Sequence, residues 1–110
     1  MMITAPRKSK QDVINTLKVS TFFPILRMNT PDDALWLAQA LFNSGLTVVE
    51  ITMDTPQAKD IITDLCLEFP DCIVGAGTVL DHNDAAIALK AGAQFLVSPI
   101  LDYPFLKFGI

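Results

Sequence analysis

Residues with side chains or turns suited to chemistry follow the apolar stretches of this 110-residue chain. The first is a cation, Arg27, and the second is a carboxylate followed by a hydroxyl, Glu50 and Thr52. The third is a glycine turn that ends in Gly77 and Thr78, and the last is the pair Ser98-Pro99. In parallel α/β proteins, ligands bind at the carboxyl ends of strands. A carboxylate can move a proton there, while a guanidinium, hydroxyls and backbone amides can hold an anionic ligand.

Glu50 is the most informative of these residues. It interrupts the segment VVEIT, which otherwise has the composition of a core strand, and alternation places it on one face with Val48 and Thr52. A buried charge is costly unless it is paired or functional. Two interpretations stay open. Glu50 either forms an ion pair with Arg27 that satisfies both charges, or acts as a general base whose pKa is raised by apolar surroundings and lowered in part by Arg27.

The glycine turn lies in the segment VGAGTV, residues 74–79. Glycines allow close backbone approach, and Thr78 could offer a hydroxyl and an amide to a carboxylate. Close packing of a helix on a strand also accounts for such glycines without any ligand. The segment is not a dinucleotide-binding fingerprint, because the third glycine is missing and Val79-Leu80 separates the turn from the next helix.

The elements that must position these residues alternate along the chain. Strand-like apolar segments begin near residues 22, 47, 72 and 94, and a helix is predicted in each gap. The predicted helix starts are Thr30-Pro31, Thr55-Pro56 and Asp81, with a further short leading helix over residues 10–18. This spacing is typical of βαβ crossovers, and nearly continuous apolar strands indicate a parallel sheet covered on both sides. Periodicity alone fits both a closed barrel and an open sheet.

The composition argues against several classes of protein and of functional site. The net charge is −4 without a basic stripe, which argues against a nucleic-acid partner. No apolar run approaches the roughly 20 residues of a membrane span, and no signal peptide is recognised, so we expect a cytoplasmic protein. Cys66 and Cys72 are predicted to be reduced, buried thiols, and His82 a residue at a helix start. No metal site is expected.

The joint pattern of these segments resembles a known family. VVEIT, EFPDCIVGAGTVL and AGAQFLVSP, with the opening PILRMNTPDDALWLAQALFNSGLTVVEIT, are similar to the 2-keto-3-deoxy-6-phosphogluconate (KDPG) and 4-hydroxy-2-oxoglutarate (KHG) aldolases. The resemblance covers about residues 11–102 and implies the N-terminal half of a (β/α)8 TIM barrel. Residues 1–110 then form one partial barrel domain: the leading helix and the first four βα units. The family also implies a homo-oligomer, usually a trimer, with no metal and no cofactor.

The chemistry that the resemblance implies is that of a class I aldolase, a lyase. A lysine forms a Schiff base with the 2-oxo group of a KDPG-like or 4-hydroxy-2-oxoglutarate substrate, and pyruvate plus an aldehyde are released. By motif, Glu50 takes the acid/base role. The substrate contacts implied or expected are Arg27, Thr52, Gly77, Thr78 and Pro99.

Three departures limit this transfer. Asp54 stands where many members have an arginine, and Ile100 where a glycine is common. The family's lysine lies on its sixth strand, whereas the lysines of this chain fall on predicted helices or tails: Lys8, Lys10, Lys18, Lys59, Lys90 and Lys107. No Schiff-base lysine is therefore assigned, and we expect the chain alone to be inactive. The alternative is a non-catalytic half barrel that serves in assembly or interaction; a thiamine phosphate synthase relative fits the motifs less well.

Overall fold

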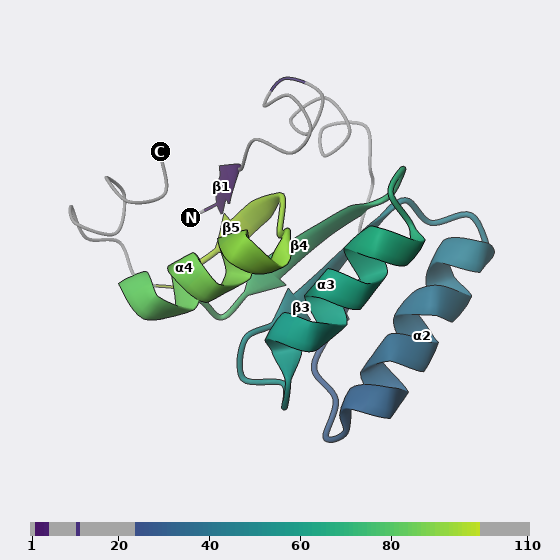
Figure 1. Ribbon diagram of the computed structural model, residues 1–110, viewed down its shortest axis with the longest axis horizontal. Helices are drawn as coiled ribbons and strands as arrows, with labels where there is room; N and C mark the ends of the chain where they lie inside the picture. The colour runs from purple at the N-terminus through teal and green to yellow at the C-terminus, as the bar shows by residue number, and fades with distance from the viewer. Residues whose placement is uncertain (1, 5–10, 12–23, 100–110) are drawn as a thin grey trace.

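The computed structural model describes residues 2–4, residue 11 and residues 24–99 (Figure 1). The strands and helices in these ranges are β1 (Met2–Thr4), β2 (Ile25–Leu26), α2 (Pro31–Asn43), β3 (Val48–Thr52), α3 (Ala58–Glu68), β4 (Ile73–Gly77), α4 (His82–Ala91) and β5 (Phe95–Val97). The leading helix predicted over residues 10–18 lies outside the described residues except for Gln11, which is helical. Ile100 also lies outside them.

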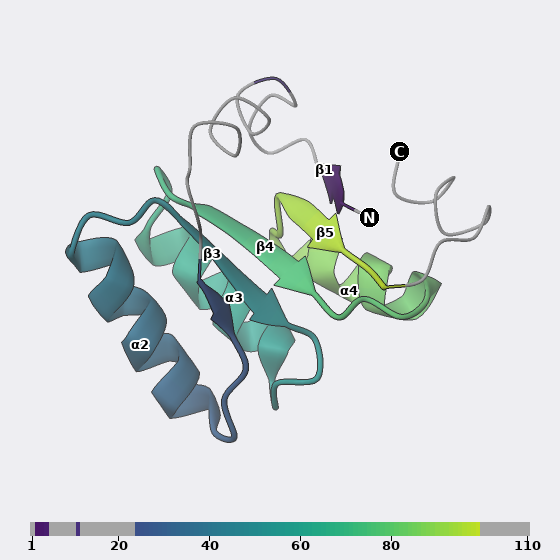
Figure 2. The same cartoon turned by 180° about the vertical axis from the view of Figure 1, so that it is seen from behind.

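The strands form one sheet in the order β1-β5-β4-β3-β2. Strands β2 to β5 are parallel neighbours, which confirms the predicted succession of βα units. Helices α2, α3 and α4 lie on one face of the sheet, and the strands are in front when the molecule is viewed from behind (Figures 1 and 2). Within the described residues, helices thus cover one face of the sheet and not both.

A short strand that the sequence did not predict lies at one edge of this sheet. Strand β1 pairs antiparallel with β5, with Thr4 opposite Phe95 and Met2 opposite Val97. Three residues are too few to show a period of two, so β1 has no clear signal in the sequence.

Two helices begin where their capping residues predict. The Thr30 hydroxyl accepts a hydrogen bond from the Asp33 amide, and Pro31 is the first residue of α2. At α4, a carboxylate oxygen of Asp81 accepts a hydrogen bond from the Asp84 amide at 2.8 Å. Each contact satisfies one of the amides that lack a partner in the first turn of a helix, which explains why these starts were predictable.

The predicted start of α3 is wrong by two residues. The sequence suggested Thr55 as the N-cap and Pro56 as the first residue, but the helix begins at Ala58. The Thr55 hydroxyl lies 3.0 Å from the Thr52 hydroxyl instead of capping the helix. Gln57 has a φ of 56°, in the left-handed region, so the chain cannot be helical there.

The two faces of the sheet contribute to separate apolar clusters. Side chains on the helix-covered face join the larger core, among them Val49, Ile51, Val74, Ala76 and Leu96. The opposite face carries a small cluster of Val48, Ile73 and Phe95, with Val97 packed against it. Consecutive residues therefore point to opposite faces, as the pleat of a strand requires.

The two cysteines and the histidine are not part of a metal site in the described residues. Cys66 is buried, Cys72 is half-buried, and no disulfide joins the two. His82 is exposed at the first position of α4. In the described part of the chain, no group of three or more His, Cys, Asp or Glu side chains could hold a metal ion. No helix in that part is both long and apolar enough to cross a membrane.

Candidate active site

Glu50 lies in the middle of β3 and points away from the helices. Its neighbours Val49 and Ile51 join the helix-side core, so alternation places Glu50 on the opposite face with Val48. Its side chain is nevertheless buried, with 4% of the residue exposed. The sequence-based prediction of the face that Glu50 occupies is therefore confirmed.

Gly77 makes room for the Glu50 side chain. A Cβ added to Gly77 would collide with Oε2 of Glu50, and would lie 2.6 Å from its Cδ and 3.1 Å from its Cγ. Gly75, two residues earlier on the same face, has a comparable role toward Phe95, whose ring occupies the space of a Cβ. The two glycines are thus explained by close approach of side chains from the neighbouring strands.

The surroundings of Glu50 favour its protonated form. Burial raises the pKa of the Glu50 carboxyl, and the positive charge of Arg27 lowers it in part. No ion pair joins Glu50 to Arg27 in the described structure, so the purely structural pairing that the sequence left open is not formed. The Glu50 carboxyl can therefore donate or accept a proton, and it lies in surroundings with little exposure to solvent.

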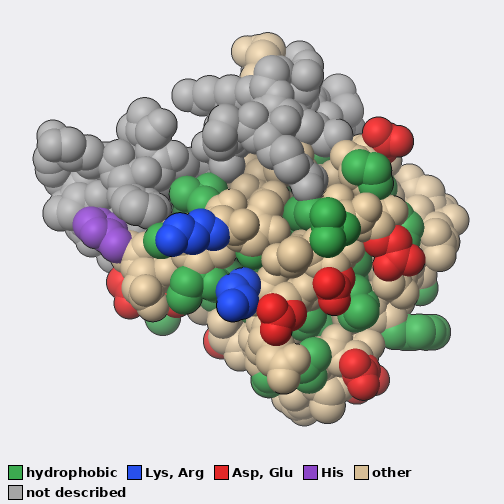
Figure 3. Space-filling view, in the orientation of Figure 1, with side chains coloured by type: hydrophobic (Ala, Val, Ile, Leu, Met, Phe, Trp, Pro, Cys, Tyr) green, Lys and Arg blue, Asp and Glu red, His purple; other side chains and the backbone are tan. Residues whose placement is uncertain are grey.

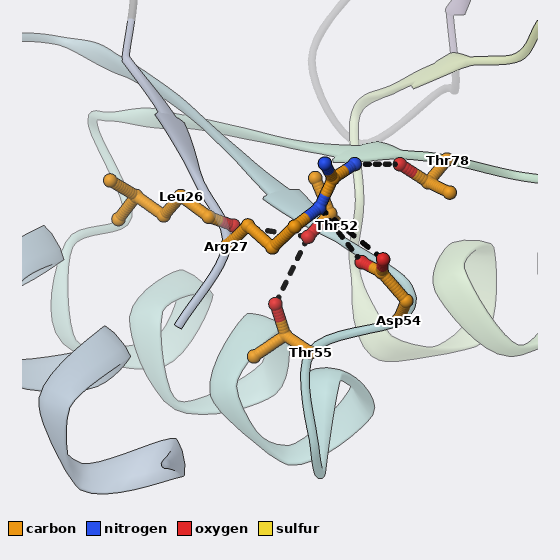
Figure 4. A network of polar contacts seen from close by, with 6 residues as sticks. All are labelled: Leu26, Arg27, Thr52, Asp54, Thr55 and Thr78. Atoms are coloured by element: carbon orange, nitrogen blue, oxygen red, sulfur yellow. Dashed lines mark hydrogen bonds and ion pairs between the residues drawn. The ribbon is translucent and has the colours of Figure 1, made fainter. Parts of the chain in front are cut away.

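Arg27 instead connects the ends of three neighbouring strands. It follows β2, and its Nε donates to Oδ1 of Asp54, in the turn after β3, at 3.3 Å (Figure 4). Its Nη2 donates to Oγ1 of Thr78, directly after β4, at 2.9 Å. The Thr52 hydroxyl and the Arg27 guanidinium lower the pKa of the Asp54 carboxyl, which therefore stays ionised. No signal in the sequence indicated the contact between Arg27 and Asp54.

Thr78 has an unusual backbone conformation. Its φ is 53°, in the left-handed region that a β-branched residue seldom adopts. Such a conformation costs on the order of 1–3 kcal/mol and is found most often at functional sites. Thr78 is half-buried and directly follows Gly77, the residue that contacts Glu50. Its hydroxyl accepts the hydrogen bond from Arg27.

Thr52 and Pro99 lie at strand ends, as the sequence predicts. The Thr52 hydroxyl donates to the Leu26 carbonyl oxygen at 3.2 Å and lies 3.0 Å from the Thr55 hydroxyl, and the residue is 1% exposed. These contacts hold β3 to β2 and to the turn that follows it. Pro99 is exposed, two residues after β5. Roles in substrate binding stay predictions for both residues.

The lysines within the described ranges do not lie beside Glu50. Lys59 belongs to α3 and Lys90 to α4, and both side chains are exposed. Both helices cover the face opposite Glu50, and in the view of that face red acidic side chains lie near the blue basic ones (Figure 3). Among the described residues, therefore, no lysine amine lies on the face that carries Glu50.

The family model for "KDPG and KHG aldolase" matches residues 13–110 of the chain. The chain belongs to this family. The KHG/KDPG aldolase of Escherichia coli (strain K12) is 38% identical over 98 residues, which are 89% of this chain and 46% of that protein. The 2-dehydro-3-deoxy-phosphogluconate aldolase of Dickeya dadantii (strain 3937) is 42% identical over 84 residues, covering 76% of this chain and 39% of that protein. The chain spans less than half the length of these curated relatives, which are lyases.

Solved structures of family members share the fold. A Legionella pneumophila KDPG aldolase with pyruvate captured as a covalent carbinolamine intermediate has a TM-score of 0.71 at 38% identity, covering 79% of this chain and 42% of that one. The Zymomonas mobilis ZM4 enzyme with 3-phosphoglycerate has a TM-score of 0.72 at 36% identity, covering 86% and 44%. The predicted fold class is confirmed: the described residues form four parallel strands with a helix after each of the first three, as in the corresponding part of these TIM barrels.

Proposed function

We propose that this chain provides the acid/base group and the carboxylate contacts of a class I aldolase site that acts on small 2-oxo acids. The reaction is cleavage of a KDPG-like or 4-hydroxy-2-oxoglutarate substrate into pyruvate and an aldehyde. Family membership supports the reaction class, and the surroundings of Glu50 support its role. Pyruvate-type acids are the ligands proposed; nucleic acid, membrane, metal and cofactor have no part in the proposal.

The chemistry proposed uses an amine as electron sink. A carbinolamine, the species captured in the Legionella protein, is the adduct of an amine with a carbonyl carbon. Loss of water gives an iminium, which can accept the electron pair of the bond between the α and β carbons when that bond breaks, leaving an enamine. The aldehyde product then leaves, and the enamine that remains takes a proton before hydrolysis releases pyruvate and the free amine.

Glu50 is proposed to handle the proton in this sequence. Its carboxylate removes the proton of the substrate hydroxyl as the C–C bond breaks, and the carboxylic acid returns a proton in the reverse direction. A pKa raised by burial brings the group closer to the pH at which proton transfer is efficient. Arg27 and Thr78 are proposed to hold the 2-oxo acid carboxylate, with Gly77, Thr52 and Pro99 forming the surrounding surface.

One observation carries this proposal: the Glu50 side chain is buried on the helix-free face and lies against Gly77, next to the Arg27–Thr78 contact. If this position served stability alone, an apolar residue would be expected there, because burying a carboxyl group is costly. Val48, on the same face, is such a residue. The lysine that the mechanism needs is not among the described residues, and we propose that the chain by itself is catalytically silent.

Assembly and cellular location are also proposed. Ile25 on the helix-free side of the sheet is 61% exposed, and an apolar residue at a sheet edge favours association. A protein cage made by fusing symmetric oligomeric domains contains a chain 31% identical to this one, with a TM-score of 0.69. These findings support a homo-oligomer, for which the family suggests a trimer. Metabolic relatives support a cytoplasmic location.

Borohydride trapping tests the proposed chemistry. The purified chain is incubated with pyruvate and sodium borohydride, and its intact mass is measured. An unmodified chain supports catalytic silence, and a covalent pyruvate adduct would contradict it and show that the chain holds its own amine. Binding is measured separately from the ¹H–¹⁵N spectrum during a pyruvate titration. Shifts at Thr78 and at the Arg27 Nε–H are expected, and their absence would contradict the carboxylate site and leave a non-catalytic assembly piece.

A further inference from the structure

The ion pair between Arg27 and Asp54 needs an explanation beyond stability. It is the one ion pair found within the described ranges, and its side chains are 61% and 50% exposed. Exposed pairs of this kind contribute little to the free energy of folding, because water screens them and both side chains lose freedom. Its place in the fold is more informative, since it lies at the strand ends beside Glu50 and Thr78.

Asp54 already occupies part of the guanidinium that would bind an anion. Of the three nitrogens of Arg27, Nε donates to Asp54 and Nη2 donates to Thr78. The described residues supply no partner for the third nitrogen, Nη1. A ligand carboxylate therefore meets an arginine on which one carboxylate is already bound, and it can gain the usual two parallel hydrogen bonds only by displacing Asp54 or sharing Nη2.

The charges around this position are close to balanced before any ligand arrives. Arg27 contributes one positive charge, and the ionised Asp54 offsets it. Glu50, on the neighbouring strand β3, adds a negative charge whenever it is ionised. The described lysines lie on the helices of the other face and add nothing here. The repulsion that Asp54 exerts grows in proportion to ligand charge, so Asp54 disfavours a dianion about twice as strongly as a monoanion.

We propose that Asp54 is a specificity-determining residue, a resident carboxylate on Arg27 that restricts the site to small 2-oxo acids with a single negative charge near that arginine. The inference rests on the proposed function, because it takes the Arg27–Thr78 position as the carboxylate site. Asp54 provides no hydrogen-bond donor for the ligand carboxylate, and it also competes with the ligand for the donors of Arg27. A ligand with a second anionic group at this position is expected to bind more weakly.

The test is a titration of ¹⁵N-labelled chain with two probes of similar size at pH about 7.5. Pyruvate carries one negative charge and oxalate carries two. The signals followed are the Arg27 Nε–H and the Thr78 amide. Asp54→Asn removes the competing charge and keeps the size of the side chain. Asp71→Asn, in the exposed turn before β4 at the far end of the sheet, makes the same change in net charge and is the matched control.

The wild-type chain is expected to bind pyruvate more tightly than oxalate. Asp54→Asn should tighten oxalate binding about tenfold and pyruvate binding by a smaller factor, while Asp71→Asn should leave both within about twofold of wild type. Oxalate affinity that is the same in Asp54→Asn as in wild type overturns the inference, and the proposed function stands if pyruvate still shifts Arg27 and Thr78. If pyruvate shifts neither signal in any variant, the carboxylate site itself is wrong and the inference falls with it.

Discussion

Glu50 and Ile51 are consecutive residues of β3, and both are buried, but they lie in different surroundings. Ile51 points to the helices and packs in the continuous apolar core. Glu50 points to the other face, where a small cluster, two glycines and a carboxyl group meet. One face of the sheet therefore provides most of the stability, and the other holds the groups that could do chemistry.

The comparison teaches that these two properties are separable in this fold. A charge on the helix side would have no polar partner among the apolar side chains of that core. On the helix-free side the same strand accommodates a carboxyl group because Gly77 gives it space and Arg27 partly offsets its charge. Substitutions on the helix side should change the free energy of unfolding, and those near Glu50 should change titration and ligand binding.

The largest effect is expected from Ile51→Ala. Removing three buried carbons from a fully buried side chain leaves a cavity in the core and should lower the free energy of unfolding by about 2–5 kcal/mol. Urea unfolding followed by circular dichroism measures this loss. Ile25→Ala is the control, because Ile25 is largely exposed and its truncation should cost less than about 1 kcal/mol. Similar losses for both variants would contradict the comparison.

Gly75→Ala should also destabilise the chain, by about 1–3 kcal/mol. The new methyl group would overlap the ring of Phe95, which is fully buried. Thermal unfolding measures the effect, and Phe95→Leu in the same chain tests its cause. The double variant should lose less than the sum of the two single variants, because the smaller side chain leaves room for the methyl group. Strict additivity would rule out the proposed clash.

Gly77→Ala should have a different outcome at an equivalent position of the same strand. Its methyl group meets the flexible end of Glu50, which can swing toward solvent, so the loss of stability should be smaller than for Gly75→Ala. The displaced carboxyl becomes better hydrated, and its pKa should fall toward the ordinary glutamate value. Carboxyl ¹³C titration of both variants measures this. A Glu50 pKa unchanged by Gly77→Ala would show that the contact does not control the carboxyl.

Glu50→Gln should stabilise the chain at neutral pH, by a few degrees in Tm. The pKa of Glu50 is raised in the folded state, so its contribution is fully present below the unfolded-state pKa and is lost as pH rises through the folded-state value. The advantage of glutamine is therefore expected at pH about 7 and should disappear at pH about 4. Asp71→Asn, which removes one negative charge from an exposed turn, is the matched control. An advantage that grows as the pH falls would reverse the sign of this account.

Asp54→Asn should have the smallest effect on folding, below about 1 kcal/mol, because the pair with Arg27 is exposed. Thermal melts of the wild-type and variant chains measure it. A small change in stability beside a large change in oxalate affinity would separate ligand selection from folding. A loss of several kcal/mol would instead make the pair a structural element.

Most of the fold could be predicted from the sequence because its signals are local. The capping residues Thr30 and Asp81 act within one helical turn, and alternation in VVEIT places Glu50 on the correct face. The start of α3 could not be predicted in the same way, since a hydroxyl contact between Thr52 and Thr55 replaces the cap that Thr55 seemed to offer.

The sequence suggested candidate residues for the site but gave no indication of their contacts. Arg27 and Thr78 are 51 positions apart, and Arg27 and Asp54 are 27 apart, so their hydrogen bonds depend on the order of strands in the sheet. The sequence left an Arg27–Glu50 pair open because it places the two charges on consecutive strand segments. It gave no reason for Arg27 to choose Asp54 instead, because that choice depends on the turn after β3.

A pH titration of the Glu50 carboxyl ¹³C signal, with and without saturating pyruvate, tests most directly that Glu50 is a buried proton carrier beside a carboxylate site. The midpoint is expected above that of an ordinary glutamate, and pyruvate should raise it further, because a bound anion disfavours a second negative charge nearby. A midpoint at the ordinary value that pyruvate does not move would contradict the account.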